Sequence, residues 1–306
     1  MEKVIKRLTE KIDSEYIIEN ADMSQEVSFK AGGRADLLVE PQSIEQLQHL
    51  LQVLDEENVN HIIMGNGSNF LIKDGGYRGV VVKMISENFA YTQLMEDGLT
   101  VKVGAATLLS QMARFLLGNE LTGFEFASGI PGSIGGAVFM NAGAYGGEMK
   151  DCIVSAKAVS KDGREVKELS LDDLKLSYRK SALYETGDVV VEATFKFEKG
   201  DKEAISERMK ELNQQRNAKQ PVNYPSAGSF FKRPEGYFAG KLVQDAGLKG
   251  YTVGGAQVSE LHSGFVINKG GATATDIVNL MHHCQAEVER QFGVKLEPEV
   301  RILGED

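Results

Sequence analysis

A serine followed closely by two cations is the first feature of this sequence that could do chemistry. Ser229 lies between Gly228 and two phenylalanines, and Lys232 and Arg233 come directly after them. This arrangement suits a hydroxyl at the wall of a site for an anion. No histidine is near in sequence, so an activated nucleophile of the serine-triad kind is not indicated. A turn that enters a strand explains the same residues, and taken alone it is the favoured interpretation.

These cations belong to a basic stretch in an acidic chain. The formal net charge of the 306 residues is −10, which argues against general nucleic-acid binding. Between positions 208 and 249, eight basic residues stand against three acidic ones. That local excess suggests a concave site for a small anionic ligand, although a solvated basic face fits the composition equally well. The eight are Arg208, Lys210, Arg216, Lys219, Lys232, Arg233, Lys241 and Lys249.

Glycine is concentrated in a second part of the chain. Seven of the nineteen residues from Gly129 to Gly147 are glycine. Glycine loses the most backbone freedom on folding, so this density needs a reason. Close approach of the backbone to a bulky anionic ligand is one reason, and a run of tight turns is the other.

A shorter glycine loop, Gly65–Asn69, follows an apolar segment typical of a strand. It is not a dinucleotide fingerprint, because Phe70 occupies the third glycine position and no helix is expected after it. Its backbone N–H groups could still hold a phosphate. Taken alone, a plain tight turn is the favoured interpretation.

The elements that must position these loops are of mixed type. Residues 35–65 predict a strand, a helix begun by a capping box of Ser43 and Gln46, and a second strand. Residues 80–197 predict mostly strands, interrupted by a helix that Thr107 caps and Gly118 ends. A charged helix is expected from about 201 to 215.

The end of the chain predicts a third group of elements. The apolar spacing from Ile277 to Val288 indicates a helix that Gly293 ends, and residues 294–303 alternate as a strand. Pro298 lacks an N–H, which favours an edge position for that strand.

Other features exclude several classes of protein. Residues 1–20 show apolar residues at helical spacing with charges between them, which predicts an amphipathic surface helix rather than a secretory signal. No apolar run approaches the roughly 20 residues of a membrane span. Cys152, Cys284 and the five histidines form no metal-ligand spacing, and both cysteines are expected in the core. We therefore expect a cytoplasmic protein without metal.

Seven segments, taken together, resemble the UDP-N-acetylenolpyruvoylglucosamine reductases of bacterial cell-wall synthesis. Each segment alone is a weak signal, but their common order is specific, and the resemblance extends from about Phe29 to Leu303. The segments are 65–69, 128–136, 141–146, Tyr178–Arg179, Arg216 with Lys219, 227–232 and 296–301.

The resemblance implies an α+β chain. Its expected parts are a two-subdomain FAD-binding fold of the vanillyl-alcohol oxidase type and a C-terminal α/β substrate-binding subdomain. An N-terminal amphipathic helix would occupy residues 1–27. The FAD-binding domain would cover 28–200, with subdomains at about 28–84 and 85–200, and the substrate-binding domain 201–306.

The resemblance also implies an activity. Such an enzyme uses FAD as cofactor and NADPH as electron donor. It reduces the enolpyruvyl ether of UDP-N-acetylglucosamine to UDP-N-acetylmuramate, a peptidoglycan precursor. Its partner is therefore a small-molecule UDP-sugar, and we expect no nucleic acid, membrane or metal to take part.

Site residues carry over from the family's motifs position by position. Arg179, Ser229 and Glu299 would be catalytic. Substrate would be bound by Tyr178, Arg216, Lys219, Lys232 and Arg233. FAD would be held by Gly65, Asn66, Gly67, Ser68, Asn69, Ser128, Gly129, Pro131, Gly132, Gly135, Gly136, Asn141, Gly143, Ala144, Tyr145 and Gly146.

The substrate explains the chemistry that these residues would have to perform. Its alkene is conjugated to a carboxylate, so hydride addition at the terminal carbon builds negative charge on that carboxylate. Arg179 is always charged and can form a bidentate fork, so it suits the stabilisation of that charge. By the resemblance, Ser229 then protonates the inner carbon. Glu299 would either be protonated itself or orient Arg179 or a water. Arg301 is expected on the same strand face, and its charge favours the ionised form of Glu299.

Two departures from the family pattern affect the substrate site. The longer form of the family inserts a tyrosine-bearing loop after its Tyr-Arg motif. Here Tyr178–Arg179 is followed almost directly by a strand at Val189, as in the shorter form, so the sequence does not indicate how substrate is covered. Arg233 replaces an amide found in some members, which favours phosphate binding at that position.

Two other functions remain as alternatives. An oxidase on the same flavin fold would need access for oxygen and no UDP site, and the basic residues argue for a diphosphate instead. A non-catalytic nucleotide-binding module would bind no flavin, and would give Arg179, Ser229 and Glu299 no reason to meet.

Overall fold

The computed structural model describes residues 1–306 and separates the chain into two units, each built from three segments. The first unit consists of Met1–Glu19, Leu37–Asn66 and Gly79–Gln215. The second consists of Asn20–Asp36, Gly67–Arg78 and Arg216–Asp306. The chain thus passes between the units five times.

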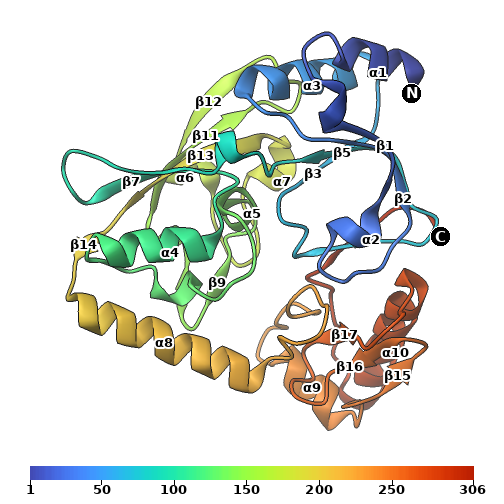
Figure 1. Ribbon diagram of the computed structural model, residues 1–306. Helices are drawn as coiled ribbons and strands as arrows, with labels where there is room; N and C mark the ends of the chain where they lie inside the picture. The colour runs from blue at the N-terminus through green and yellow to red at the C-terminus, as the bar shows by residue number, and fades with distance from the viewer. The chain divides into compact units, whose positions relative to one another are not determined.

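A five-stranded antiparallel sheet forms the centre of the first unit (Figure 1). Its strand order is β12-β11-β13-β7-β6. The expected strands are present, and Val101, Val103, Ala193 and Phe195 are all buried in one apolar core. The strands are β6 (Thr92–Leu94), β7 (Thr100–Gly104), β11 (Ile153–Val159), β12 (Val166–Ser170) and β13 (Val189–Lys196).

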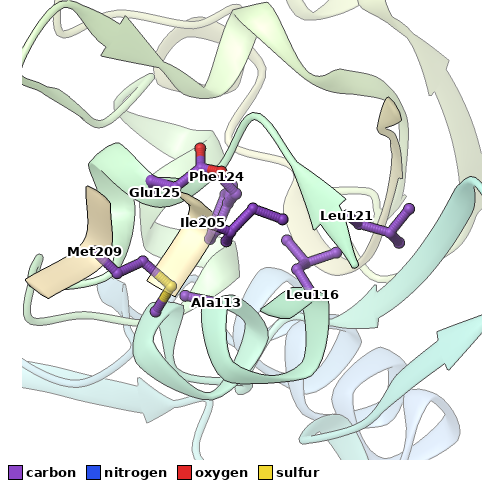
Figure 2. Close-up of a pocket in the computed structure, with 7 residues that line it drawn as sticks. All are labelled: Ala113, Leu116, Leu121, Phe124, Glu125, Ile205 and Met209. Carbon is purple, nitrogen blue, oxygen red and sulfur yellow. The ribbon is translucent and has the colours of Figure 1, made fainter. Parts of the chain in front are cut away.

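Two helices cover the same core. They are α4 (Leu109–Gly118) and α5 (Ile134–Phe139), and α5 contacts both β13 and β7. The charged helix α8 (Lys202–Lys219) buries Ile205 and Leu212. Where Ile205 and Met209 face α4, they line a small apolar recess (Figure 2). Glu125 is the one charged residue that lines it, and the recess has no room for a water molecule.

A second core in the first unit lies under α3 (Ile44–Glu56) and α1 (Glu2–Leu8). The Ser43 cap is confirmed: the Gln46 N–H donates to Ser43 Oγ at 3.2 Å. The Gln46 side chain accepts from the Gln42 N–H at 2.8 Å instead of completing the expected box with Ser43. After α3, β3 (His61–Met64) pairs in parallel with β5 (Tyr77–Lys83) in a sheet of order β1-β2-β5-β3. The other two strands are β1 (Ile17–Asp22) and β2 (Arg34–Val39).

The second unit holds a small sheet with a long helix. Strands β15 (Thr252–Val253), β16 (Ala256–Val258) and β17 (Val266–Asn268) are antiparallel, and α10 (Ala274–Phe292) packs on β15, β16 and α9 (Ala239–Asp245). The expected apolar face of α10 is buried, and Gly293 ends the helix in the left-handed conformation. In a separate pair, β4 (Phe70–Ile72) runs parallel to β18 (Arg301–Leu303).

The remaining elements are short. They are α2 (Met23–Glu26), α6 (Leu171–Leu174), α7 (Leu183–Thr186), β8 (Leu121–Thr122), β9 (Gly143–Ala144), β10 (Gly147–Glu148), β14 (Glu198–Lys199), and the 3-10 helices Ser14–Tyr16, Glu87–Phe89, Glu125–Ala127 and Met149–Asp151. No helix is both long and apolar enough to cross a membrane. Both cysteines are buried free thiols, as expected, and burial raises the pKa of each to about 12.

Three expectations about elements were wrong. The N-terminal helix ends at Leu8 rather than near position 20, because the residues that follow favour turns and then pair as β1. Thr107 is not a helix cap; its hydroxyl donates to the Tyr91 carbonyl, and Leu108 precedes α4. The last strand covers only Arg301–Leu303, and Pro298 forms an isolated bridge with Phe231 instead.

Candidate active site

The two glycine loops meet within the first unit. Gly65 follows β3, and Ser133 directly precedes α5. A Cβ placed on Gly65 would lie 2.5 Å from Ser133 Oγ, a distance that real side chains do not reach. A side chain at position 65 would therefore require the Ser133 hydroxyl to move. Ser133 is buried and joins the two loops. It was not among the expected site residues. Its position directly before a helix was the sequence feature that could have identified it.

The glycine-rich segment has two kinds of glycine. A Cβ on Gly143 would lie 2.6 Å from the Gly147 carbonyl, and one on Gly147 would lie 2.6 Å from the Phe126 ring, so internal packing explains both. Gly136 is different, because a Cβ there would meet no atom within 4 Å. A glycine inside a helix costs about 1 kcal/mol relative to alanine. The backbone at Gly136 in α5 is therefore open to close approach from outside the helix.

The Tyr178–Arg179 pair forms the tip of a tight turn in the first unit. The Ser177 N–H donates to the Lys180 carbonyl at 2.9 Å, and the Lys180 N–H donates back at 3.1 Å. Arg179 adopts the left-handed conformation, with φ of 53°. Its Nη2 donates to the Gly143 carbonyl at 3.2 Å, so the guanidinium lies beside the glycine-rich segment. The structure therefore brings Arg179 together with residues expected to hold FAD.

Ser229 and Glu299 lie on adjacent segments of the second unit. The Glu299 N–H donates to the carbonyl of Phe230 at 2.8 Å, and the Lys232 N–H donates to the Glu297 carbonyl at 2.8 Å. Phe230 is fully buried, whereas the neighbouring Ser229 is exposed and Glu299 is half-buried. The buried ring thus anchors a short pairing that leaves the serine accessible.

The end of the short glycine loop holds the Glu299 segment in place. Asn69 Nδ2 donates to the Glu299 carbonyl at 3.2 Å, and the Asn69 carbonyl accepts from the Arg301 N–H at 3.0 Å. The Arg301 guanidinium also lies 5.0 Å from the centroid of the Phe70 ring. Within this unit, an expected cofactor residue and an expected catalytic residue are therefore in direct contact.

The expected substrate cations of the second unit occupy two places. Arg216 and Lys219 lie in the last turn of α8, where cations stabilise the helix dipole in any case, and Arg216 donates to Gln220 at 3.2 Å. Lys232 pairs with Glu297 at 3.4 Å. The Arg233 guanidinium lies 4.0 Å from the ring centroid of Phe238, which is 63% exposed. The exposed ring thus holds the Arg233 cation through a cation–π contact.

The expected site residues divide between the units as follows. The first unit holds Gly65, Asn66, Ser128, Gly129, Pro131, Gly132, Gly135, Gly136, Asn141, Gly143, Ala144, Tyr145, Gly146, Tyr178 and Arg179. The second holds Gly67, Ser68, Asn69, Arg216, Lys219, Ser229, Lys232, Arg233 and Glu299. No group of three or more histidine, cysteine, aspartate or glutamate side chains could hold a metal ion.

Two family models match the chain. An FAD binding domain matches residues 35–168, and the C-terminal domain of UDP-N-acetylenolpyruvoylglucosamine reductase matches residues 220–303. The sequence is also 50% identical over 304 residues to the UDP-N-acetylenolpyruvoylglucosamine reductase of Lachnoclostridium phytofermentans, covering 99% of this chain and 97% of that relative.

Solved structures give the same result at the level of the fold. The crystal structure of UDP-N-acetylenolpyruvylglucosamine reductase from Thermus caldophilus matches with a TM-score of 0.79 and 32% identity, over 94% of this chain and 97% of that one. A variant of berberine bridge enzyme matches with a TM-score of 0.51 and 11% identity, over 66% of this chain and 44% of that one. The second likeness concerns the fold alone.

Proposed function

The chain belongs to the UDP-N-acetylenolpyruvoylglucosamine reductase family, and we propose that Arg179, Ser229 and Glu299 carry out its reaction. The activity is that of an FAD-dependent UDP-N-acetylmuramate dehydrogenase in peptidoglycan precursor synthesis, with NADPH as the family's reductant. The substrate is the enolpyruvyl ether of UDP-N-acetylglucosamine. The place of the reaction is the cytoplasm, where UDP-sugars and NADPH are available.

FAD, when bound, supplies the hydride for the alkene. The chain's own part is to present the bare backbone of Gly136 and the loop around Gly65 to the cofactor. Neither glycine loop contains a cysteine or histidine, so we propose noncovalent binding. Heat or acid precipitation should therefore release the yellow colour into the supernatant.

Arg179 is assigned to the substrate carboxylate. Negative charge grows there when hydride adds to the alkene, and a preorganised cation lowers the energy of that state. Support comes from the bond between Arg179 Nη2 and the Gly143 carbonyl, which fixes the guanidinium beside the glycine-rich segment before any ligand arrives. A guanidinium suits the role better than an ammonium because its planar fork matches a carboxylate.

Ser229 is assigned as the proton donor to the inner carbon. A hydroxyl is a weak acid, but the carbanion that it must quench is strongly basic. The observation that supports this assignment is the pairing of its segment with that of Glu299, which leaves Ser229 exposed beside a fully buried Phe230. Glu299 is the third catalytic residue of the proposal, and its N–H donates to the carbonyl of Phe230, the residue after Ser229.

Ser229→Ala tests the assignment because it should separate the two half-reactions. NADPH oxidation requires no proton donor at the substrate carbon, so reduction of the flavin should keep its rate. Flavin reoxidation by the enolpyruvyl substrate should slow by about 10²- to 10⁴-fold, the usual contribution of a positioned acid. Ser229→Cys should recover part of that loss, since a thiol also donates a proton.

The measurement is anaerobic stopped-flow absorbance of the flavin in each half-reaction. Flavin content and melting temperature serve as controls for a structural effect. Equal slowing of both steps, or slowing of the NADPH step alone, would remove Ser229 from the role of proton donor.

A further inference from the structure

Three hydrogen bonds join the glycine-rich segment to the turn that carries Arg179. Ser181 Oγ donates to the Phe139 carbonyl at 2.5 Å. Asn141 Nδ2 donates to the Ser177 carbonyl at 3.1 Å, and Arg179 Nη2 donates to the Gly143 carbonyl at 3.2 Å. The bonds connect alternate residues of one segment to the turn, so they fix its position against the segment.

Asn141 is the central link of this set. It has no exposed surface and adopts the left-handed conformation, with φ of 45°. While its Nδ2 donates to Ser177, its Oδ1 accepts from the Lys150 N–H at 2.9 Å. Both polar atoms of the amide are thus engaged by main-chain groups. The side chain points into the protein, and this contrasts with the ligand contact that the family motif suggested for position 141.

We propose that Asn141 is a positioning residue for Arg179 rather than a cofactor ligand. The inference rests on the proposed role of Arg179 at the substrate carboxylate. Asn141 fixes the first residue of the turn, two positions before Arg179, and thereby sets where the guanidinium stands when substrate binds. A displacement of about 1 Å at a reacting group can cost about 100-fold in rate. A buried amide without contact to ligand can therefore control catalysis through its main-chain partner.

The left-handed backbone decides which variants are informative. Alanine would be strained at φ of 45°, whereas glycine and aspartate both tolerate that conformation. Asn141→Gly removes both hydrogen bonds without strain. Asn141→Asp keeps the acceptor for the Lys150 N–H but loses the donor to Ser177.

A matched control exists elsewhere in the first unit. Asn119 Nδ2 donates to the Phe115 carbonyl at 2.8 Å at the end of α4, far in sequence from the Arg179 turn. Asn119→Asp therefore removes the same kind of amide-to-carbonyl bond without touching the turn. It should change the melting temperature slightly and leave both half-reactions unchanged.

The decisive experiment is a double-mutant cycle in the flavin-loaded enzyme. Asn141→Gly and Asn141→Asp should each slow reoxidation by the substrate about 10- to 100-fold while leaving flavin content and the NADPH step unchanged. In an Arg179→Ala background, the same changes should alter reoxidation by no more than about twofold, because the group they position is gone. Hydrogen exchange should also rise in residues 176–182 of both Asn141 variants, but not of Asn119→Asp.

The outcomes separate this inference from the function on which it rests. Normal reoxidation in Arg179→Ala would defeat the proposed role of Arg179 itself. Slow reoxidation in Arg179→Ala, together with normal reoxidation in both Asn141 variants, would overturn the positioning role alone. Effects that multiply in the double variants, or loss of FAD from both Asn141 variants, would also overturn it.

Discussion

Arg216 and Lys219 have two possible uses at the end of α8, and only one of them concerns substrate. The carbonyls of the last turn attract cations, so both residues contribute to the helix whether or not a ligand binds. A diphosphate would gain from the same charges through charge-assisted bonds. The two uses predict different losses when the side chains are removed.

We expect Arg216→Ala and Lys219→Ala to raise KM for the sugar nucleotide. Each change removes one charge-assisted contact, so the increase should be about 10- to 100-fold, which corresponds to the usual 1.5–3 kcal/mol. Flavin content should stay at the level of the unchanged enzyme. Steady-state kinetics with the flavin absorbance as a control measures both quantities. An equal loss of FAD would assign these cations to the cofactor instead.

Individual site residues were predictable from the sequence to different degrees. The order of the motifs gave Arg179, Ser229 and Glu299 by family resemblance, but not the left-handed turn that holds Arg179. Ser133 and the inward side chain of Asn141 depend on contacts between segments distant in sequence. A local pattern can place Ser133 before a helix, but it does not show which distant segment a side chain will contact.

At the scale of elements, the sequence predicted the end of a helix correctly where the capping residue lies next to that helix in the sequence. The Ser43 cap of α3 and the Gly293 end of α10 both follow from residues within one turn of the helix. The last strand was predicted to be too long, because the alternating residues pair with two different segments of the chain. Residues 297–299 pair with the segment after Ser229, and 301–303 pair with β4.

The start of α10 contains a cap that comes from outside the helix. Asp74 accepts from the Ala274 N–H at 2.9 Å and from the Thr275 N–H at 2.8 Å, next to the local capping box of Thr273 and Asp276. These bonds satisfy N–H groups that a helix leaves unpaired at its first turn.

Asp74→Ala should lower the free energy of unfolding by about 0.5–2 kcal/mol, the usual worth of a helix cap. Urea denaturation followed by circular dichroism measures it. Asp74→Asn should lose less, because the amide oxygen still accepts from one N–H group. Glu207→Ala, which removes an exposed charge on α8, is the control. If Asp74→Ala lowers the free energy of unfolding no more than this control does, the cap contributes nothing.

Each unit is assembled from three separate segments of the chain, and this arrangement affects how the whole molecule folds and unfolds. The second unit takes two segments from the first 78 residues of the sequence, Asn20–Asp36 and Gly67–Arg78. These segments supply β4 as the partner of β18, Asp74 as a cap of α10, and the Phe29 carbonyl that accepts from Asn268 Nδ2 at 3.0 Å. A contiguous C-terminal piece lacks all three.

We therefore expect a fragment of residues 201–306 to show no cooperative thermal transition. A full chain cut at a protease site inserted between Gly200 and Asp201 retains every segment and is the control; it should unfold cooperatively. Calorimetry of both samples tests this. A cooperative transition in the fragment would mean that the boundary expected near position 200 marks an independent domain.

The pairing of β4 with β18 also has a consequence for how the protein is made. Strand β4 leaves the ribosome early, whereas its partner β18 is translated long after it. A nascent chain must therefore carry the open edge of β4 until β18 has been translated, and such an edge invites pairing with other chains. Any product of premature termination before β18 would keep that edge, and termination before Glu299 would also remove a proposed catalytic residue. Incomplete copies should thus be inactive and also recognisable to the proteases and chaperones that remove them.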